Sequence, residues 1–344
     1  MSALIIAGAL VVIVILRRPL ADTGDAILAF LDDFLERRGG GALGRAPMAA
    51  VLLAPTLIIL GVFGVAPLFY ALYMSLFDYK KDAFVGLSNY AKALTHEDFW
   101  NSFLVTSYYA AFTIPLTMLV SYLVAHWLYR TVRGRGLFRT VYFLPYVTSI
   151  VAAATVWRVI LRPQQGLAND LVGLMGVPPQ QWLLEPRGIL SLITAGLVPP
   201  TVGPGLDLFC IILFEIWHSS GFMIVIFLAG LTAIPKEFEE AARIDGAGSL
   251  QVVRHVTLPL LSPTIFFLAV VSLIRSFQAF NSFYALTSKQ GGDSTRNMML
   301  YIYSNFYEYG RLGYGAAVAT LLSAAIIVFT LIQWRFLGRR VHYE

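Results

Sequence analysis

The chain has 344 residues, of which 58% are hydrophobic and 13% are charged, with a formal net charge of +5. A soluble domain has about 25% charged residues, so the composition excludes an ordinary soluble protein. The single cysteine, Cys210, excludes an intrachain disulfide and any CxxC metal or redox site. The basic residues form no patch on a soluble domain, so we expect no nucleic-acid partner. Several long apolar runs predict a polytopic membrane protein.

The first apolar run, residues 2–16, is short and is followed by Arg17 and Arg18. It is either a cleaved signal peptide or an uncleaved anchor over 1–18, and the late position of the arginines favours the anchor. Residues 19–47 follow, with a predicted amphipathic interfacial helix at 22–38 and a glycine hinge at 39–44. A plain linker helix is the alternative for 22–38. The remaining chain, 48–344, forms the predicted core.

Six apolar segments of the core predict membrane-spanning helices, because lipid offers no hydrogen-bond partners to irregular backbone or strand edges. They lie at roughly 48–77, 101–129, 141–161, 208–232, 263–286 and 314–337. Pro55, Pro67 and Pro115 fall inside these spans and predict kinks. The predicted fold is therefore an all-α polytopic membrane protein with six core helices and one extra N-terminal helix.

Lys and Arg are concentrated in alternate loops, at 17–47, 130–140, 233–262 and in the C-terminal tail. Cytoplasmic loops carry an excess of these residues, so we place these four segments inside the cell. This predicts an outer N-terminus and a cytoplasmic C-terminus in a plasma membrane.

The cytoplasmic segment 234–262 contains the stretch "EEAARIDGAGSLQVVRHVTLPLL" at 239–261. Pro235 suits the first turn of a helix, and Gly246 suits a left-handed position that ends it. Ser249 can cap a second short helix through about Val256, which Leu258-Pro259 would end. The segment therefore predicts a helix, a tight turn and a second helix, with a plain surface loop as the alternative.

This segment closely resembles the EAA loop of ABC importer permeases. The resemblance rests on Glu240-Ala241-Ala242, Asp245-Gly246-Ala247 and Leu258-Pro259. The stretches "GRGLFRTVYFLPYVTSIVAAATVWRVI" at 134–160 and "FQAFNSFYALT" at 277–287 resemble the carbohydrate-uptake branch, as in the larger, first-named subunit of maltose and glycerol-3-phosphate systems. The resemblance covers about 48–344, with the family's transmembrane region at about 101–336.

The resemblance does not cover 1–45, and it fits poorly at 186–207, an apolar insertion rich in Pro and Gly on the outer side. This insertion caps the outer mouth, contacts a binding protein or forms a re-entrant piece, and the sequence leaves these three open.

The resemblance implies a type I ABC importer fold and a permease that works with a second permease, two ATPase copies and an external binding protein. The chain has no GxxxxGK[ST] motif, so ATP and Mg are expected on the ATPase, with no cofactor, metal or catalytic residue here. In the family, the EAA loop sits in a cleft of the ATPase. Glu240 is then an anchor for a basic residue there, Gly246 forms the turn, and Asp245 caps or pairs locally.

Two charges, Glu215 and Arg275, lie within predicted spans at similar depth, which allows an ion pair. Such charges are costly in a membrane and are usually paired or face a cavity, so a structural pair and a role in solute passage both remain open. Sugars are bound by aromatic faces and by amide or hydroxyl groups. Candidate residues for a solute pathway are Gln278, Asn281, Ser282, Tyr284 and, more weakly, His218, with helix–helix hydrogen bonding as the alternative.

Three other functions account for parts of this sequence. A proton-coupled secondary transporter could use Glu215 and His218, but it does not explain the helix-turn-helix segment. A membrane-embedded enzyme lacks an HExxH or GxSxG motif. An ABC permease of the glycerol-3-phosphate type would need more cavity cations than Arg275, which favours neutral sugars without identifying one.

Overall fold

The computed structural model describes residues 53–78, 83–130, 134–194, 197–199, 203–287 and 292–338. The predicted anchor 1–18, the amphipathic helix and the glycine hinge within 19–47 lie outside the described residues and stay predictions. The chain divides into two compact units, Met1–Tyr70 and Ala71–Glu344. All sites discussed below belong to the second unit.

Four described helices are long and apolar enough to cross a membrane: Leu53–Ser75, α5 (Glu97–Arg130), α10 (Leu206–Ala233) and α17 (Leu312–Phe336). The ends of these helices agree with the predicted spans to within a few residues. The first of them contains a π-helical stretch, η1 (Leu60–Val65), followed by α3 (Ala66–Ser75). Pro67 lacks the N–H that an α-helical ladder needs there, which is a physical cause for the distortion.

The predicted span over 141–161 is broken by a sharp bend. The segment forms α6 (Arg135–Val147) and α7 (Ile150–Ile160), which are bent by 93° at the break between them. Thr148 is extended, and its hydroxyl donates to the carbonyl of Pro145 at 2.7 Å. Proline within the last turn of α6 and a local side-chain hydrogen bond together end the helix inside an apolar run.

The expected span 263–286 is also interrupted. Helix α14 (Ser262–Phe277) ends near Gln278, and α15 (Asn281–Leu286) starts after a short break. At its other end, α14 follows α12 (Ser249–Val252), the π-helix η3 (Val253–Thr257) and α13 (Leu258–Leu260), with a bend of 67°. Either bent helix pair can count as one span, which gives up to six spans among the described residues.

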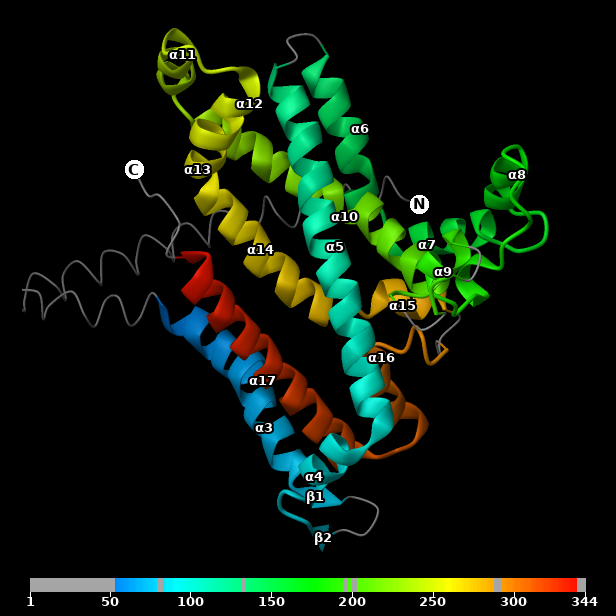
Figure 1. The fold of residues 1–344 in the computed structure, drawn as a ribbon. Coiled ribbons are helices and arrows are strands. Elements are labelled where there is room, and N and C mark those ends of the chain that lie inside the picture. Colours follow the sequence, from blue (N-terminus) through cyan, green and yellow to red (C-terminus); the bar gives the residue numbers. More distant parts are fainter. Residues whose placement is uncertain are drawn as a thin grey trace, which may run out of the picture. The chain divides into compact units, whose positions relative to one another are not determined.

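Shorter elements connect the spans (Figure 1). Strands β1 (Phe77–Asp78) and β2 (Ala83–Phe84) pair antiparallel. The other elements are α4 (Ser88–Thr95), α8 (Leu167–Gly173), the 3-10 helix η2 (Trp182–Leu184), α9 (Ile189–Ile193), α11 (Lys236–Ile244), α16 (Met298–Tyr303) and the π-helix η4 (Ser304–Glu308).

The insertion at 186–207 closes on itself. Gly188 and Gly205 form an isolated antiparallel bridge, and Ile189 N–H donates to the carbonyl of Pro204 at 3.1 Å. At its base, Arg187 donates to both carboxylate oxygens of Glu185 at 2.7 and 2.8 Å, and these hydrogen bonds lower the pKa of Glu185. Helix α9, with five residues, spans only about 8 Å and is too short to cross the membrane.

Helix α10 supplies much of the buried core, and it packs against α5 and α6. The approach to α6 depends on Gly221, where an added Cβ would lie 2.3 Å from the backbone oxygen of Tyr142. Ser121 on α5 donates to the carbonyl of Ser220 at 3.3 Å beside this contact. A small residue at 221 therefore sets the spacing of α6 and α10, beside their contact with α5.

Gly221→Ala should lower the stability of the purified protein by about 1–3 kcal/mol, because overpacking at a backbone contact forces the helices apart. The measurement is the thermal unfolding midpoint in detergent. Gly136→Ala is the matched control on α6, since nothing lies within 4 Å of its added Cβ. Equal midpoints for the two variants would contradict the close α6–α10 contact.

Candidate functional site

The helix, turn and second helix predicted for 234–262 are present. Helix α11 ends in two nested hydrogen bonds. Ala247 N–H donates to the carbonyl of Ala242 at 2.9 Å, and Gly246 N–H donates to the carbonyl of Arg243 at 3.1 Å. This is a Schellman motif, whose left-handed position requires Gly246 at φ 85°. The prediction for Gly246 is confirmed by this geometry, and the turn is rigidly defined by backbone bonds.

The second helix starts one residue earlier than expected. Gly248 is its N-cap, and Gly248 N–H donates to Oε1 of Gln251 at 2.7 Å, so Ser249 is the first helical residue rather than the cap. The expectation that Leu258-Pro259 ends this helix is wrong. Pro259 stands at the start of α13, where a missing N–H is tolerated, and the helical backbone continues to Leu260.

The turn presents exposed side chains that have no partners among the described residues. Glu240, Ala241 and Asp245 are exposed, while Ala242 and Ala247 are half-buried. Ile244 and Leu250 flank the turn and are 87% and 81% exposed. Two large apolar side chains beside a charged helix form a surface suited to another protein. We call residues Lys236–Val252 the coupling loop.

Sequence reasoning missed Ile244 and Leu250. The sequence does carry a signal for both residues. Ile244 is the last residue of the helix that carries Glu240, and Leu250 comes shortly after the Gly-Ala-Gly turn. A shallow cavity of about 330 Å³ beside them is lined by Ala242, Asp245, Gly246, Ala247, Gln251, His255 and Val256.

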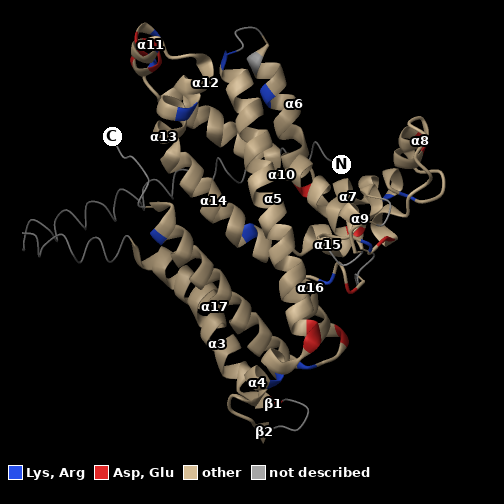
Figure 2. Ribbon diagram, in the orientation of Figure 1, with Lys and Arg blue, Asp and Glu red and all other residues tan. Residues whose placement is uncertain are grey.

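A second site lies between α5, α10 and α14. Glu215 and Arg275 both line it, but the described ion pairs do not include them, so the direct pair considered from the sequence is absent in this structure. Ser219 donates to the carboxylate of Glu215 instead. Figure 2 shows α14 as mostly uncharged apart from one blue segment, and Arg275 is the basic residue of its last turn.

Arg275 is held by aromatic side chains. Its Nη2 donates to the hydroxyl of Tyr146 at 2.9 Å, and its guanidinium carbon lies 5.7 Å and 5.1 Å from the ring centroids of Tyr146 and Phe222. The side chain is exposed, although Arg275 lies roughly 20 Å along the helix from Ser262. A charge at that depth faces an aqueous path or another subunit rather than lipid.

The enclosed part of this site is small, about 30 Å³, which is room for about one water molecule. Three residues of its wall, Thr113, Thr117 and Ser272, have buried hydroxyls with no hydrogen-bond partner among the described residues. Buried hydroxyls are nearly always satisfied, so water or a ligand hydroxyl is the natural partner for them. We call the site lined by Glu215, Arg275 and these hydroxyls the membrane cavity.

The other predicted pathway residues do not line the membrane cavity. Gln278 and Asn281 are exposed at the break between α14 and α15, and Ser282 is buried. The Tyr284 ring lies 5.1 Å from that of Phe280 and 5.5 Å from that of Tyr303. His218 is buried, its Nε2 has no hydrogen-bond partner among the described residues, and its ring stacks on Phe214 at 5.7 Å.

Two residues of the site were not singled out from the sequence. Tyr146 lies just before the break after α6, and Phe222 follows Gly221 on α10. In the sequence, Tyr146 is marked only by its position directly after Pro145. In the structure it lies near the end of α6, where its hydroxyl accepts a hydrogen bond from Arg275. Nothing in the sequence distinguishes Phe222 from the many other apolar residues of α10.

The family described as "Binding-protein-dependent transport system inner membrane component" matches residues 114–343. The trehalose/maltose transport system permease protein MalF of Thermococcus litoralis is 28% identical over 292 residues, covering 84% of this chain and 92% of its own. The sn-glycerol-3-phosphate transport system permease protein UgpA of Agrobacterium fabrum is 30% identical over 302 residues, covering 85% and 95%.

The fold is similar to a chain in the crystal structure of a bacterial alginate ABC transporter in complex with an alginate pentasaccharide-bound periplasmic protein. The TM-score is 0.69 at 21% identity, with 86% of this chain and 95% of that chain covered. This similarity confirms the predicted importer fold. The chain belongs to the family of binding-protein-dependent transport system inner membrane components: it is a multi-pass permease subunit of an ABC importer, and a transport component rather than an enzyme.

Proposed function

We propose that this chain imports a sugar or sugar-like solute, together with a second permease, two copies of an ATPase and an external binding protein. The observation that carries the solute class is the membrane cavity. A guanidinium beside two stacked aromatic rings, a carboxylate and hydroxyls without described partners offer the donors, acceptors and apolar faces that a sugar requires. The cavity has room for about one water molecule in this structure, so it must widen to pass a sugar.

The relative named for sn-glycerol-3-phosphate transport raises a phosphorylated solute as the second candidate. Of the described residues that line the membrane cavity, Arg275 is basic and Glu215 is acidic, which leaves the lining without net charge. A phosphate group carries up to two negative charges and is usually held by several cations or backbone N–H groups. The lining therefore favours an uncharged sugar, as does the name of the trehalose/maltose relative.

The coupling loop is proposed to dock on the ATPase. It is connected to the membrane cavity by consecutive helical segments, from Ser249 through η3 and α13 to Phe277 at the end of α14, with a bend of 67° between Leu260 and Ser262. Arg275 lies in the last turn of that stretch. Movement of the loop when the ATPase closes on ATP would therefore shift the helix that carries the cavity's guanidinium, which is coupling through a two-state element.

The proposed orientation places the coupling loop and the C-terminus in the cytoplasm and the N-terminus outside. It is based on the excess of Lys and Arg in alternate loops, which is typical of the cytoplasmic side. ATP and Mg would be bound by the ATPase. The host membrane would be the plasma membrane of a bacterium or an archaeon.

The proposal is tested by reconstituting the full assembly in liposomes with the binding protein and radiolabelled sugars. We expect uptake that requires ATP, the ATPase and the binding protein together. Uptake that continues without the ATPase, driven by a proton gradient, would overturn it. Uptake of sn-glycerol-3-phosphate in preference to every sugar tested would keep the importer and reject the solute class.

A further inference from the structure

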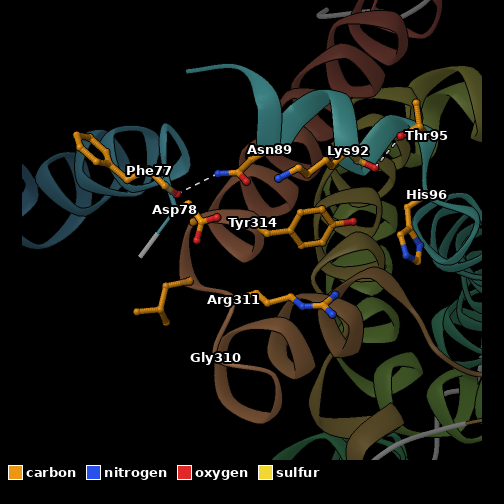
Figure 3. Close-up of a pocket in the computed structure, with 11 residues that line it drawn as sticks. Phe77, Asp78, Asn89, Lys92, Thr95, His96, Gly310, Arg311 and Tyr314 are labelled. Atoms are coloured by element: carbon orange, nitrogen blue, oxygen red, sulfur yellow. Dashed lines mark hydrogen bonds between the residues drawn. The ribbon is translucent and has the colours of Figure 1, made fainter. Parts of the chain in front are cut away.

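A third site lies far from the coupling loop. A cavity of about 380 Å³ is formed where the β1–β2 hairpin and α4 meet the start of α17 (Figure 3). Figure 1 shows α4 and α11 at opposite ends of α5. With the coupling loop in the cytoplasm, this cavity opens on the outer side. We call it the outer socket.

The frame of the outer socket is held by buried contacts. Asn89 is 4% exposed, and its Nδ2 donates to the carbonyls of Ser75 and Phe77 at 2.8 and 3.0 Å. The backbone of Gly313 lies against the same strand, since a Cβ there would be 1.8 Å from the oxygen of Phe77. Ser75 also shares a hydrogen bond of 2.6 Å with the hydroxyl of Tyr90. The socket is therefore preformed rather than a gap between loose loops.

The two basic residues of the outer socket have no ion-pair partner among the residues that the structure describes. Lys92 on α4 and Arg311 before α17 line it, and neither takes part in a described ion pair within 4.0 Å. The guanidinium of Arg311 lies 5.5 Å from the ring centroid of Tyr309, which holds it in place. Asp78 contributes the acidic group of the lining, and His96 adds a titratable ring.

We propose that the outer socket receives an acidic side chain of the external binding protein, with Lys92 and Arg311 as its counter-charges. This inference rests on the proposed function, which requires such a partner to dock on the outer side. A preformed cavity with unpaired cations supplies a fixed point for docking, because close charge pairs set the register and the rate of association.

A lipid headgroup is the other anion available at the outer surface of the membrane. It would bring acyl chains, whereas the side chains of Asn89, Thr95 and His96 give the socket a polar wall. The lining therefore favours a protein carboxylate.

The test uses the full importer in nanodiscs and the solute-loaded binding protein, with docking affinity and binding-protein-stimulated ATP hydrolysis as the two readouts. The double variant Lys92→Glu/Arg311→Glu should weaken docking at least tenfold. Hydrolysis should still approach the wild-type rate when the binding protein is saturating. Rising salt should weaken docking of the wild type more than that of the variant.

The control is the charge-conserving pair Lys92→Arg/Arg311→Lys, which should dock within about threefold of wild type. Unchanged docking of the glutamate variant would overturn the socket while leaving the importer intact. An effect that appears only in nanodiscs with anionic lipid, and is absent with zwitterionic lipid, would identify a headgroup as the occupant and also overturn it. A wild-type importer that no binding protein stimulates would instead reject the proposed function.

Discussion

Replacing Glu240 with lysine should abolish uptake while leaving the protein folded and inserted. Glu240 is exposed on α11, one turn before the Schellman turn at Gly246, and has no partner among the described side chains. If it pairs with a basic residue of the ATPase, reversal of its charge should weaken the assembly by about 2–5 kcal/mol. That is a loss of affinity of roughly 30-fold or more.

The measurement is co-purification of the ATPase with the permease pair, followed by uptake in liposomes. Glu237→Lys is the matched control, because it reverses an exposed charge in the first turn of the same helix. It should cost only the helix-dipole contribution, about 0.3–1 kcal/mol, and should keep most of the uptake. Normal uptake by Glu240→Lys, or an equal loss in both variants, would contradict the assignment.

Replacing Arg275 with alanine should reduce sugar uptake by about 10- to 100-fold at unchanged affinity of the binding protein for its sugar. The guanidinium is fixed by Tyr146 and Phe222, and a hydrogen bond to a charged group contributes about 1.5–3 kcal/mol. Tyr146→Phe keeps the ring and removes only the hydroxyl that accepts from Arg275. It should therefore show a smaller loss.

A structural role for Arg275 makes a different prediction from a role in the pathway. If the guanidinium only stabilises the helix packing, Arg275→Ala should lower the thermal midpoint and leave the uptake per folded molecule unchanged. If it contacts the solute, the midpoint should stay near wild type while the sugar concentration that half-saturates uptake rises. The measurement is transport kinetics normalised to folded importer, at saturating binding protein.

The coupling loop was predictable because its signals are local. A helix start at Pro235, a left-handed glycine at Gly246 and a new helix two to three residues later all depend on neighbouring residues. The long spans were predictable from length and hydropathy for the same reason. The error at Leu258-Pro259 arose because proline at the start of a helical segment is tolerated, whereas the sequence pattern suggested a stop.

The membrane cavity was only half predictable. Glu215 and Arg275 attract notice as charges in apolar runs, but their similar depth did not settle whether they pair. In the structure they do not pair, and Arg275 donates instead to the hydroxyl of Tyr146, which lies just before the end of α6. Such a contact across 129 residues of chain depends on tertiary packing, which no local pattern encodes. For the same reason, Gln278 and Asn281 looked suited to the cavity but lie at the exposed break after α14.

The central claim is that the coupling loop is held by a separate ATPase, and site-specific cross-linking of the assembled importer tests it most directly. The one native cysteine, Cys210, is 2% exposed, so a cysteine placed at exposed Ile244 or Leu250 can be modified selectively. With a photoactivatable thiol reagent at either position, we predict a covalent product with the ATPase in membranes that contain the whole importer. Cross-links to lipid alone, with the ATPase present and transport active, would contradict the account.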